Sequence, residues 1–372
     1  MKHLKIYMVL LMMSLSIVAC AQELPLAKAQ AWKAIFDQAK KENKMVLVDA
    51  YFEGCAPCKQ MEETVFVWPE VKQLLADSFI FSKIDFLSDT LGKALQMKYA
   101  VTGFPTFLLF NQEGRLVSRF SGYKEGDKFL KRLKEAMSQS KSNQIMAGFS
   151  PELDVAYPAF YITLFKERKS IDIQALAEWL KGKDKTKEMY AMPLLMANNL
   201  NPELNSYFLD NYARLENLYG RELVWDKRNR IIASRLKSEV PLRDDAKFDL
   251  FLKHIKPLFS ATDWPYGQLD IAENYFFNIH KDLLAFLKFA VVNFNDDDNK
   301  VRYLARNIRS EQERKVFGEW LKLVINKDSG SEVLSIAAST MTGLGDMKTA
   351  KEYGDWAAKK RELLKIHLEN YQ

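Results

Sequence analysis

The chain has 372 residues, of which 48% are hydrophobic and 27% are charged, and its net charge is +6. This balance is typical of folded globular proteins and excludes an intrinsically disordered chain, and the length suits two domains. The basic residues form no concentrated face interleaved with aromatic residues, so the sequence gives no support for nucleic-acid binding.

Residues 1–20 are expected to be a targeting segment, because Lys2 and Lys5 precede an apolar run too short for a comfortable membrane span. Two kinds of processing fit. The tetrapeptide Ile-Val-Ala-Cys ending at Cys20 resembles a bacterial lipobox, in which Cys20 is lipidated. Small residues on both sides of Cys20 also fit a signal-peptidase site that releases a soluble protein. We favour the lipoprotein, and both alternatives predict an exported protein of the periplasm or cell envelope, with a lipid anchor as its only membrane contact.

The first predicted elements are a helix within residues 24–43 and a strand that ends at Asp49. Gly54 and then Cys55-Ala-Pro-Cys58 follow, at the start of a helix running to about residue 65. Cysteines three apart on one helical turn are close enough to form a small disulfide ring. Unsatisfied backbone N–H groups and the helix dipole favour a thiolate at the first sulfur. The spacing therefore suits thiol–disulfide exchange, with Cys55 as the nucleophile and Cys58 resolving the mixed disulfide.

A C-x-x-C motif is also half of a zinc site, and it can be a structural disulfide. The chain has three cysteines and four histidines, and the histidines lie far from the motif in sequence. A structural role is poorly motivated for so short a loop, since stabilisation by a cross-link grows with loop length. We therefore favour redox use and predict no metal and no cofactor beyond the disulfide itself.

Further along the chain, a helix is predicted from Pro69 and a strand over residues 79–85. A short helix at 91–99 follows, then strands at 106–110 and 116–120 that form a hairpin, and a helix from Asp127 to about Met137. Helices and strands in this order fit a central mixed sheet covered by helices on both faces.

The segments MVLVDAYFEGCAPCKQME, VTGFPTFLLF and SGY together resemble the thioredoxin superfamily, and in particular its envelope-facing thioredoxin-like branch. The resemblance covers about residues 31–137 and implies an α/β thioredoxin fold. It places Asp49 at a buried carboxylate that passes a proton to and from Cys58, and Lys83 at a lysine near that carboxylate. Taken without the other matches, Asp49 reads as an ordinary residue at the end of a strand.

The same resemblance places Pro105 at a cis-proline that faces the two sulfurs, where Phe104 offers its backbone for strand-like pairing with a substrate peptide. Gly54 and Pro57, beside the cysteines, are expected to belong to the substrate-binding surface. Gly54 stands where thioredoxin carries tryptophan, which leaves reductase, oxidase and isomerase roles open. Pro57 favours a reductase.

A serine-rich stretch after Met137 predicts a linker, so the expected domains are residues 24–138 (thioredoxin-like), 139–149 (linker) and 150–372 (all-α). Helical periods in the last part are expected at 202–220, 223–236, 245–258, 269–289, 301–308 and 311–325. Residues 331–364 resemble one tetratricopeptide-like helix–turn–helix. A helical solenoid and a globular helical domain both remain open.

Two functions compete for this sequence. The first is an envelope thiol–disulfide oxidoreductase that reduces disulfides of protein substrates, for which the resemblance implies a membrane-embedded thiol reductase as the partner that resets it. The alternative is a non-enzymatic binding or assembly protein, in which the helical domain recruits a partner and the thioredoxin-like domain serves as a scaffold.

Overall fold

The structure is a computed structural model that describes residues 31–293 and 298–369. Its described residues belong to two compact units, one comprising residues up to Asn198 together with Asn211–Val224, and the other comprising Asn199–Asp210 and the remainder from Trp225. The expected targeting segment, 1–20, lies outside the described residues, and so does Cys20.

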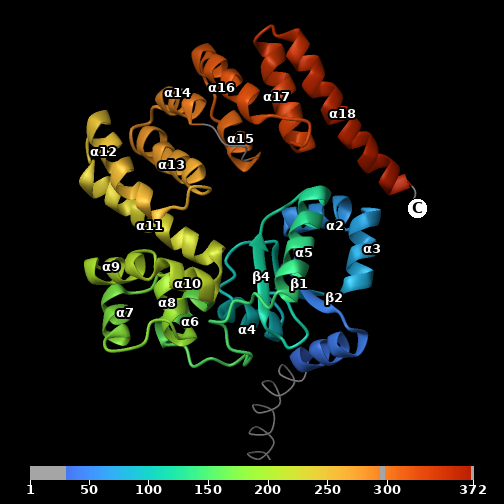
Figure 1. The fold of residues 1–372 in the computed structure, drawn as a ribbon, viewed down its shortest axis with the longest axis vertical. Coiled ribbons are helices and arrows are strands. Elements are labelled where there is room, and N and C mark those ends of the chain that lie inside the picture. The colour runs from blue at the N-terminus through green and yellow to red at the C-terminus, as the bar shows by residue number, and fades with distance from the viewer. Residues whose placement is uncertain (1–30, 294–297, 370–372) are drawn as a thin grey trace, which may run out of the picture. The chain divides into compact units, whose positions relative to one another are not determined.

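The first unit contains a mixed four-stranded sheet with the strand order β2-β1-β3-β4. Strand β1 pairs in parallel with β2 and antiparallel with β3, and β3 and β4 form an antiparallel hairpin (Figure 1). Residues 31–42 are helical and precede β1. The elements that follow are β1 (Met45–Tyr51), α2 (Ala56–Thr64), α3 (Pro69–Ser78), β2 (Phe79–Asp85), α4 (Thr90–Lys98), β3 (Thr106–Phe110), β4 (Leu116–Ser121) and α5 (Gly126–Lys141).

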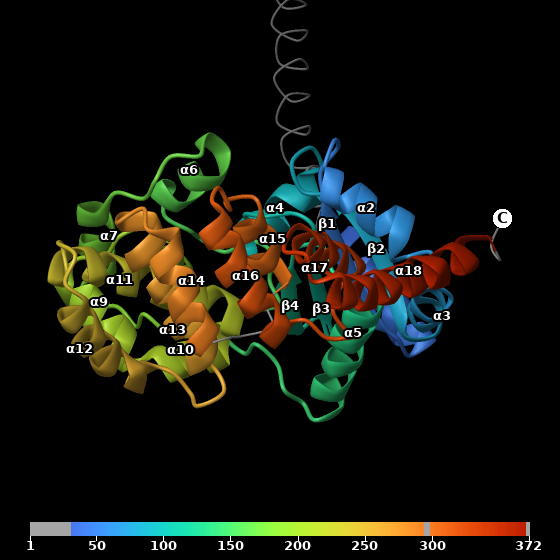
Figure 2. The ribbon, with the colours of Figure 1, turned by 90° about the horizontal axis from the view of Figure 1, so that it is seen from above.

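Helices cover both faces of this sheet, because strand side chains alternate between the two faces and both sets are apolar. On one face, Leu47 and Phe107 join a buried cluster with Met61 of α2 and Phe129 of α5. On the other face, the ring of Phe110 contacts aromatic side chains that include Trp32, at a centroid distance of 5.3 Å. The sequence-based prediction of an α/β thioredoxin fold is thereby confirmed (Figure 2).

The final helix of the sheet domain is longer than predicted. Helix α5 continues to Lys141, so the first residues of the serine-rich stretch are helical rather than linker. Just after the end of α5, Asn143 has a φ of 54°. This is the left-handed region, which asparagine tolerates. The predicted domain boundaries at 138 and 150 remain a prediction.

The chain after α5 is helical throughout its regular structure, as predicted. The first unit gains α6 (Ala159–Glu167), α7 (Ile173–Leu180), α8 (Glu188–Met196) and α10 (Tyr212–Tyr219), and α11 (Arg221–Glu239) begins in it. The second unit contains the rest of α11 and α9 (Pro202–Asp210), α12 (Asp245–Ile255), α13 (Trp264–Ala272), α14 (Leu283–Val292), α15 (Asp298–Ala305), α16 (Glu311–Val324), α17 (Ser331–Gly343) and α18 (Met347–Glu369).

Two of the predicted helices are interrupted. The helix expected over 202–220 is divided at Asn211 into α9 and α10, which belong to different units. The helix expected over 269–289 is broken at residues 280–282: α13 continues into a π-helical segment, Glu273–Ile279, which ends at His280. Lys281 adopts a φ of 58°, and the side chain of Asp282 accepts a hydrogen bond from the Ala285 N–H to begin α14. A local cap of this kind competes successfully with the continuous apolar pattern.

The last two helices form the predicted helix–turn–helix. Helices α17 and α18 are joined by Leu344-Gly345-Asp346, and Gly345 has a φ of 77° that favours glycine. Ala337 and Ala357 are buried in the core of the second unit. Small side chains at these positions let two helices approach closely. Assignment of the hairpin to the tetratricopeptide class stays a prediction.

Candidate functional site

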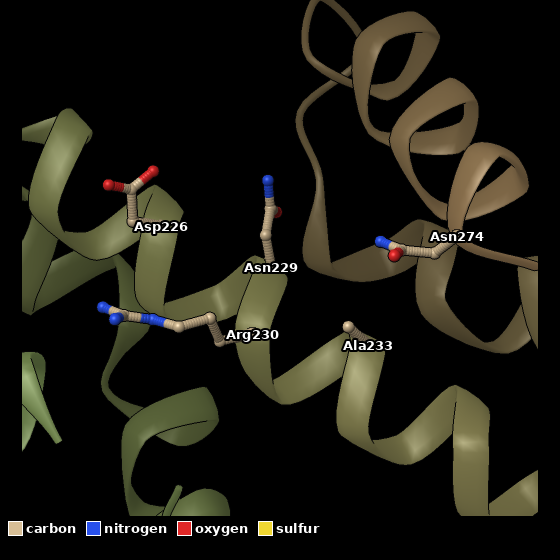
Figure 3. Close-up of a pocket in the computed structure, with 5 residues that line it drawn as sticks. All are labelled: Asp226, Asn229, Arg230, Ala233 and Asn274. Atoms are coloured by element: carbon tan, nitrogen blue, oxygen red, sulfur yellow. The ribbon is translucent and has the colours of Figure 1, made fainter. Parts of the chain in front are cut away.

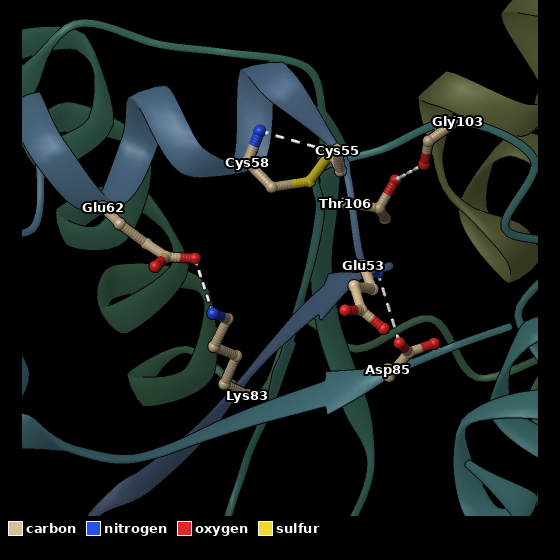
Figure 4. The surroundings of a disulfide bond; sticks show 8 residues. All are labelled: Glu53, Cys55, Cys58, Glu62, Lys83, Asp85, Gly103 and Thr106. Atoms are coloured by element: carbon tan, nitrogen blue, oxygen red, sulfur yellow. Dashed lines mark hydrogen bonds and ion pairs between the residues drawn. A yellow bond between two sulfur atoms is a disulfide. The ribbon is translucent and has the colours of Figure 1, made fainter. Parts of the chain in front are cut away.

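The centre of the candidate site is a disulfide between Cys55 and Cys58, with an S–S distance of 1.97 Å and a Cα–Cα distance of 5.3 Å (Figure 4). Cys55 is the N-cap residue of α2, and its Sγ accepts a hydrogen bond from the Cys58 N–H at 3.3 Å. The first sulfur therefore occupies the position where free N–H groups of a helix stabilise negative charge. Both cysteines are buried, with 6% of the surface of Cys55 and 3% of that of Cys58 exposed.

The local sequence explains how the sulfurs reach this position. Strand β1 ends at Tyr51, and Gly54 then turns the chain with a φ of 90°, a conformation that glycine adopts without cost. Pro57 lies in the first turn of α2, where its missing N–H costs no helical hydrogen bond. A side chain at Gly54 would meet no atom within 4 Å.

Asp85 fixes the loop that carries the first cysteine. Its carboxylate accepts hydrogen bonds from the backbone N–H of Glu53 at 3.3 Å and from those of Leu87 and Ser88 at 2.8 Å each (Figure 4). Burial raises the pKa of Asp85, but these bonds outweigh it and hold the pKa below its ordinary value. Strand β2 thus helps to place the loop that precedes Cys55.

Asp49 lies in the middle of β1, with only 2% of its surface exposed. Because strand side chains alternate, Asp49 shares a sheet face with Leu47, which clusters with Met61 of α2. Cys58 is buried one helical turn before Met61, on the same side of α2. The Asp49 Oδ1 atom has no hydrogen-bond partner among the described residues. Burial raises the pKa of Asp49 from its ordinary 3.8 to about 7, although nearby Lys83 opposes the shift.

Lys83 lies where the resemblance implied, because β2 pairs it with Asp49 of β1. Its ammonium group is nonetheless committed to other partners. It forms an ion pair with Glu62 at 2.5 Å (Figure 4). It also lies 4.2 Å from the centre of the Tyr51 ring. Hydrogen bonding to Glu62 is the main cause that raises the pKa of Lys83. Glu62 was missed in the sequence, although its position four residues after Cys58 places it one helical turn further along α2.

The loop before β3 lies beside the disulfide (Figure 4). The Phe104–Pro105 peptide bond is cis, as the resemblance implied. The ring of Phe104 contacts Phe52 at a centroid distance of 5.2 Å, and Thr106 Oγ1 donates to the Gly103 carbonyl at 2.7 Å (Figure 4). A Cβ added at Gly103 would meet no atom within 4 Å outside its chain neighbours.

Comparison with known proteins agrees with this geometry. Residues 32–137 match the family model described as a thioredoxin-like domain. This part of the chain is a thioredoxin-like domain.

Among curated proteins, the chain is similar to the thiol:disulfide interchange protein DsbD of Pseudomonas fluorescens, with 34% identity over 98 residues, which is 26% of this chain and 17% of that protein. It is also similar to thioredoxin Y2, chloroplastic, of Arabidopsis thaliana, with 32% identity over 111 residues, 30% of this chain and 62% of that protein. A solved thioredoxin from Thermus thermophilus is 25% identical, with 30% of this chain and 87% of that chain covered and a TM-score of 0.27. The chain thus spans less than two thirds of the length of these curated relatives.

A polar cavity of about 340 Å³ lies outside the thioredoxin-like domain, in the second unit (Figure 3). It is lined by the charged and amide side chains of Asp226, Asn229, Arg230 and Asn274 and by Ala233, which come from α11 and from the π-helical segment. These groups can form hydrogen bonds, whereas the redox-capable atoms of the described chain lie at the Cys55–Cys58 pair of the thioredoxin-like domain.

Within 31–293 and 298–369, no three His, Cys, Asp or Glu side chains gather as ligands for a metal ion. None of the helices in those ranges combines the length and the apolar character needed to cross a membrane.

Proposed function

We propose that this protein is a thiol–disulfide oxidoreductase that acts on protein disulfides, in the direction of reduction, through Cys55 and Cys58. The observation that carries the proposal is the position of the pair, with Cys55 capping α2 and a buried carboxylate of raised pKa on the strand beneath the same helix. The similarity of residues 32–137 to thioredoxin-like domains supports it.

In the proposed reaction, the Cys55 thiolate attacks one sulfur of a substrate disulfide. A bond forms between Cys55 Sγ and that sulfur, and the other substrate sulfur leaves as a thiolate and takes a proton from solvent. Asp49 then accepts the proton of Cys58, whose thiolate attacks Cys55 Sγ and releases the second substrate thiol. Two electrons pass from the protein to the substrate, and the protein ends with the Cys55–Cys58 disulfide.

The remaining residues have supporting roles in this proposal. Phe104 presents its backbone to an extended substrate peptide, and Pro105, Gly54 and Pro57 border the same opening. Lys83 lowers the pKa of Asp49 and so keeps part of that carboxyl ionised near neutrality. Because each cycle consumes two electrons, a dithiol donor must reset the protein. We propose a membrane-embedded thiol reductase for that role and an envelope location, with Cys20 as the lipidated residue.

The test uses the reduced full-length protein and insulin as the substrate disulfide. Wild type should reduce insulin, Cys55→Ser should abolish the reaction, and Cys58→Ser should accumulate a mixed disulfide visible on a non-reducing gel. Cys20→Ser is the matched control, because it removes the third cysteine and should leave the rate unchanged. A wild type that reduces no disulfide, with Cys55→Ser retaining full biological activity, would favour a binding or assembly protein instead.

A further inference from the structure

A buried polar cluster joins the thioredoxin-like domain to the helical segment that follows it in the first unit. The Lys98 ammonium, at the end of α4, is fully buried and donates to Glu188 Oε1 of α8 at 2.7 Å. Glu188 also accepts from the Ser150 N–H at 2.7 Å and from the Tyr157 hydroxyl at 3.1 Å. Burial lowers the pKa of Lys98, and Glu188 opposes that shift.

A second contact reaches the same end of α4. The hydroxyl of Tyr161, a residue of α6 with no exposed surface, donates to the Met97 carbonyl at 2.8 Å. The same carbonyl accepts a longer bond from the Ala100 N–H at 3.4 Å, so the Tyr161 hydroxyl is its shorter partner and helps to fix its direction. Two side chains from beyond residue 137, Glu188 and Tyr161, thus hold the last two residues of α4.

The chain that leaves α4 runs directly into the cis-proline loop. Tyr99 is buried between Phe110 and Phe149, at centroid distances of 5.3 and 5.1 Å. Ala100 follows with a φ of 50°, and its carbonyl accepts from Arg119 Nη2 at 3.3 Å. No segment of residues 99–105 has its own regular secondary structure. Within it, the Val101 N–H donates to the Gln96 carbonyl of α4 at 2.9 Å, so the position of α4 helps to set the position of this loop.

Stability alone does not account for the cluster. A buried ion pair is weak evidence for stability, because apolar side chains of similar volume often serve as well or better. Directional bonds to α4, by contrast, define one position for the start of the loop. The other end is held within the thioredoxin-like domain, by the bond from Thr106 to Gly103.

We infer that Tyr161 and Glu188 are positioning residues for substrate docking: by fixing the end of α4 they hold residues 99–105 so that the Phe104 backbone meets an extended peptide. This inference rests on the proposed function. The segment after the thioredoxin-like domain thus influences peptide substrates through the position of this loop, and it leaves the reactivity of the cysteines unchanged.

The experiment compares Tyr161→Phe with Tyr219→Phe in the full-length protein. Tyr219 is the matched control, since it is also fully buried in the first unit and its hydroxyl donates to a backbone carbonyl, that of Thr186, at 2.6 Å. Two disulfides are used, insulin and hydroxyethyl disulfide, and the latter has no peptide backbone to pair with Phe104. Hydrogen exchange of the peptide 99–104 is followed by mass spectrometry.

Tyr161→Phe should lower the second-order rate constant for insulin about fivefold and speed exchange of the loop amides by a similar factor, as expected for one lost hydrogen bond. The rate with hydroxyethyl disulfide should not change. Glu188→Gln should act in the same direction, and Tyr219→Phe should change nothing. Equal losses with both disulfides, or an unchanged insulin rate and loop exchange, would overturn the inference while leaving the proposed function intact. A wild type inactive on both disulfides would overturn both, and the exchange data would still show whether Tyr161 fixes the loop.

Discussion

Replacing Asp49 by asparagine should stabilise the first unit, and the gain should grow with pH. Asp49 has a folded-state pKa of about 7 against an ordinary value of 3.8. Between these values the folded state holds a proton that the unfolded state releases, so stability falls as pH rises. The contribution of Asp49 to stability is thus fully present below its ordinary pKa of 3.8, and it is lost as the pH rises through the folded-state pKa of about 7.

The magnitude follows from the shift. Each pH unit in the window lowers the free energy of unfolding by about 1.4 kcal/mol, so the whole shift costs wild type about 4 kcal/mol at alkaline pH. Asparagine is close in size to aspartic acid and cannot ionise. The advantage of Asp49→Asn should therefore grow by about 3 kcal/mol between about pH 5 and about pH 8, and then level off.

The assay is urea unfolding of the oxidised protein at several pH values, followed by fluorine NMR of fluorinated tryptophan. The resonance of Trp32, which is buried against the sheet of the first unit, reports that unit separately from the second. Asp85→Asn is the control of opposite sign. Its carboxylate has a lowered pKa, so that variant should lose stability at neutral pH and lose less as pH falls. A stability difference between wild type and Asp49→Asn that does not depend on pH would refute the reasoning.

Two further predictions concern the surroundings of the site. Glu62→Gln should lower the pKa of Asp49, because the Glu62 charge raises it and the variant leaves Lys83 free to turn towards Asp49. Lys83→Met should raise the same pKa, because the Lys83 charge lowers it. Carbon NMR of the Asp49 carboxyl measures both shifts. Gly92→Ala should destabilise the first unit by roughly 2 kcal/mol or more, although alanine normally favours a helix. The added Cβ would lie 2.1 Å from the Asp85 carbonyl oxygen, whereas Gly103→Ala meets nothing within 4 Å and should be nearly neutral in the same urea titration.

The thioredoxin-like domain was predictable because several short signals agree. The Cys-x-x-Cys spacing, the apolar strand before it and the proline before β3 each have a local cause, and their order along the chain fits one sheet. The helical region was predictable as a class from its periodicity. The interruptions of its helices were not predictable. The π-helical segment and the break that follows it at His280 lie in an apolar pattern that looks continuous in the sequence.

Partners distant in sequence were the other limit. Lys98 and Glu188 are 90 residues apart, and a lysine in a helix is ordinarily solvated, so nothing near either residue marks it as buried. Glu62 could have been noticed from its spacing to Cys58, but its partner Lys83 is known only once β2 is placed beside β1. Helical spacing shows which side chains share a face, and the fold decides what that face meets.

The Lys98 contact has a practical consequence for anyone who dissects this chain. A fragment that stops at Met137 would expose the Lys98 ammonium group, which is buried in the full chain, and would remove Phe149 from the ring of Tyr99. A fragment that extends to Val224 keeps both contacts and also keeps α10, whose Tyr219 packs against Phe149 at a centroid distance of 5.2 Å. An excised redox module should therefore be cut after Val224 rather than where the family match ends.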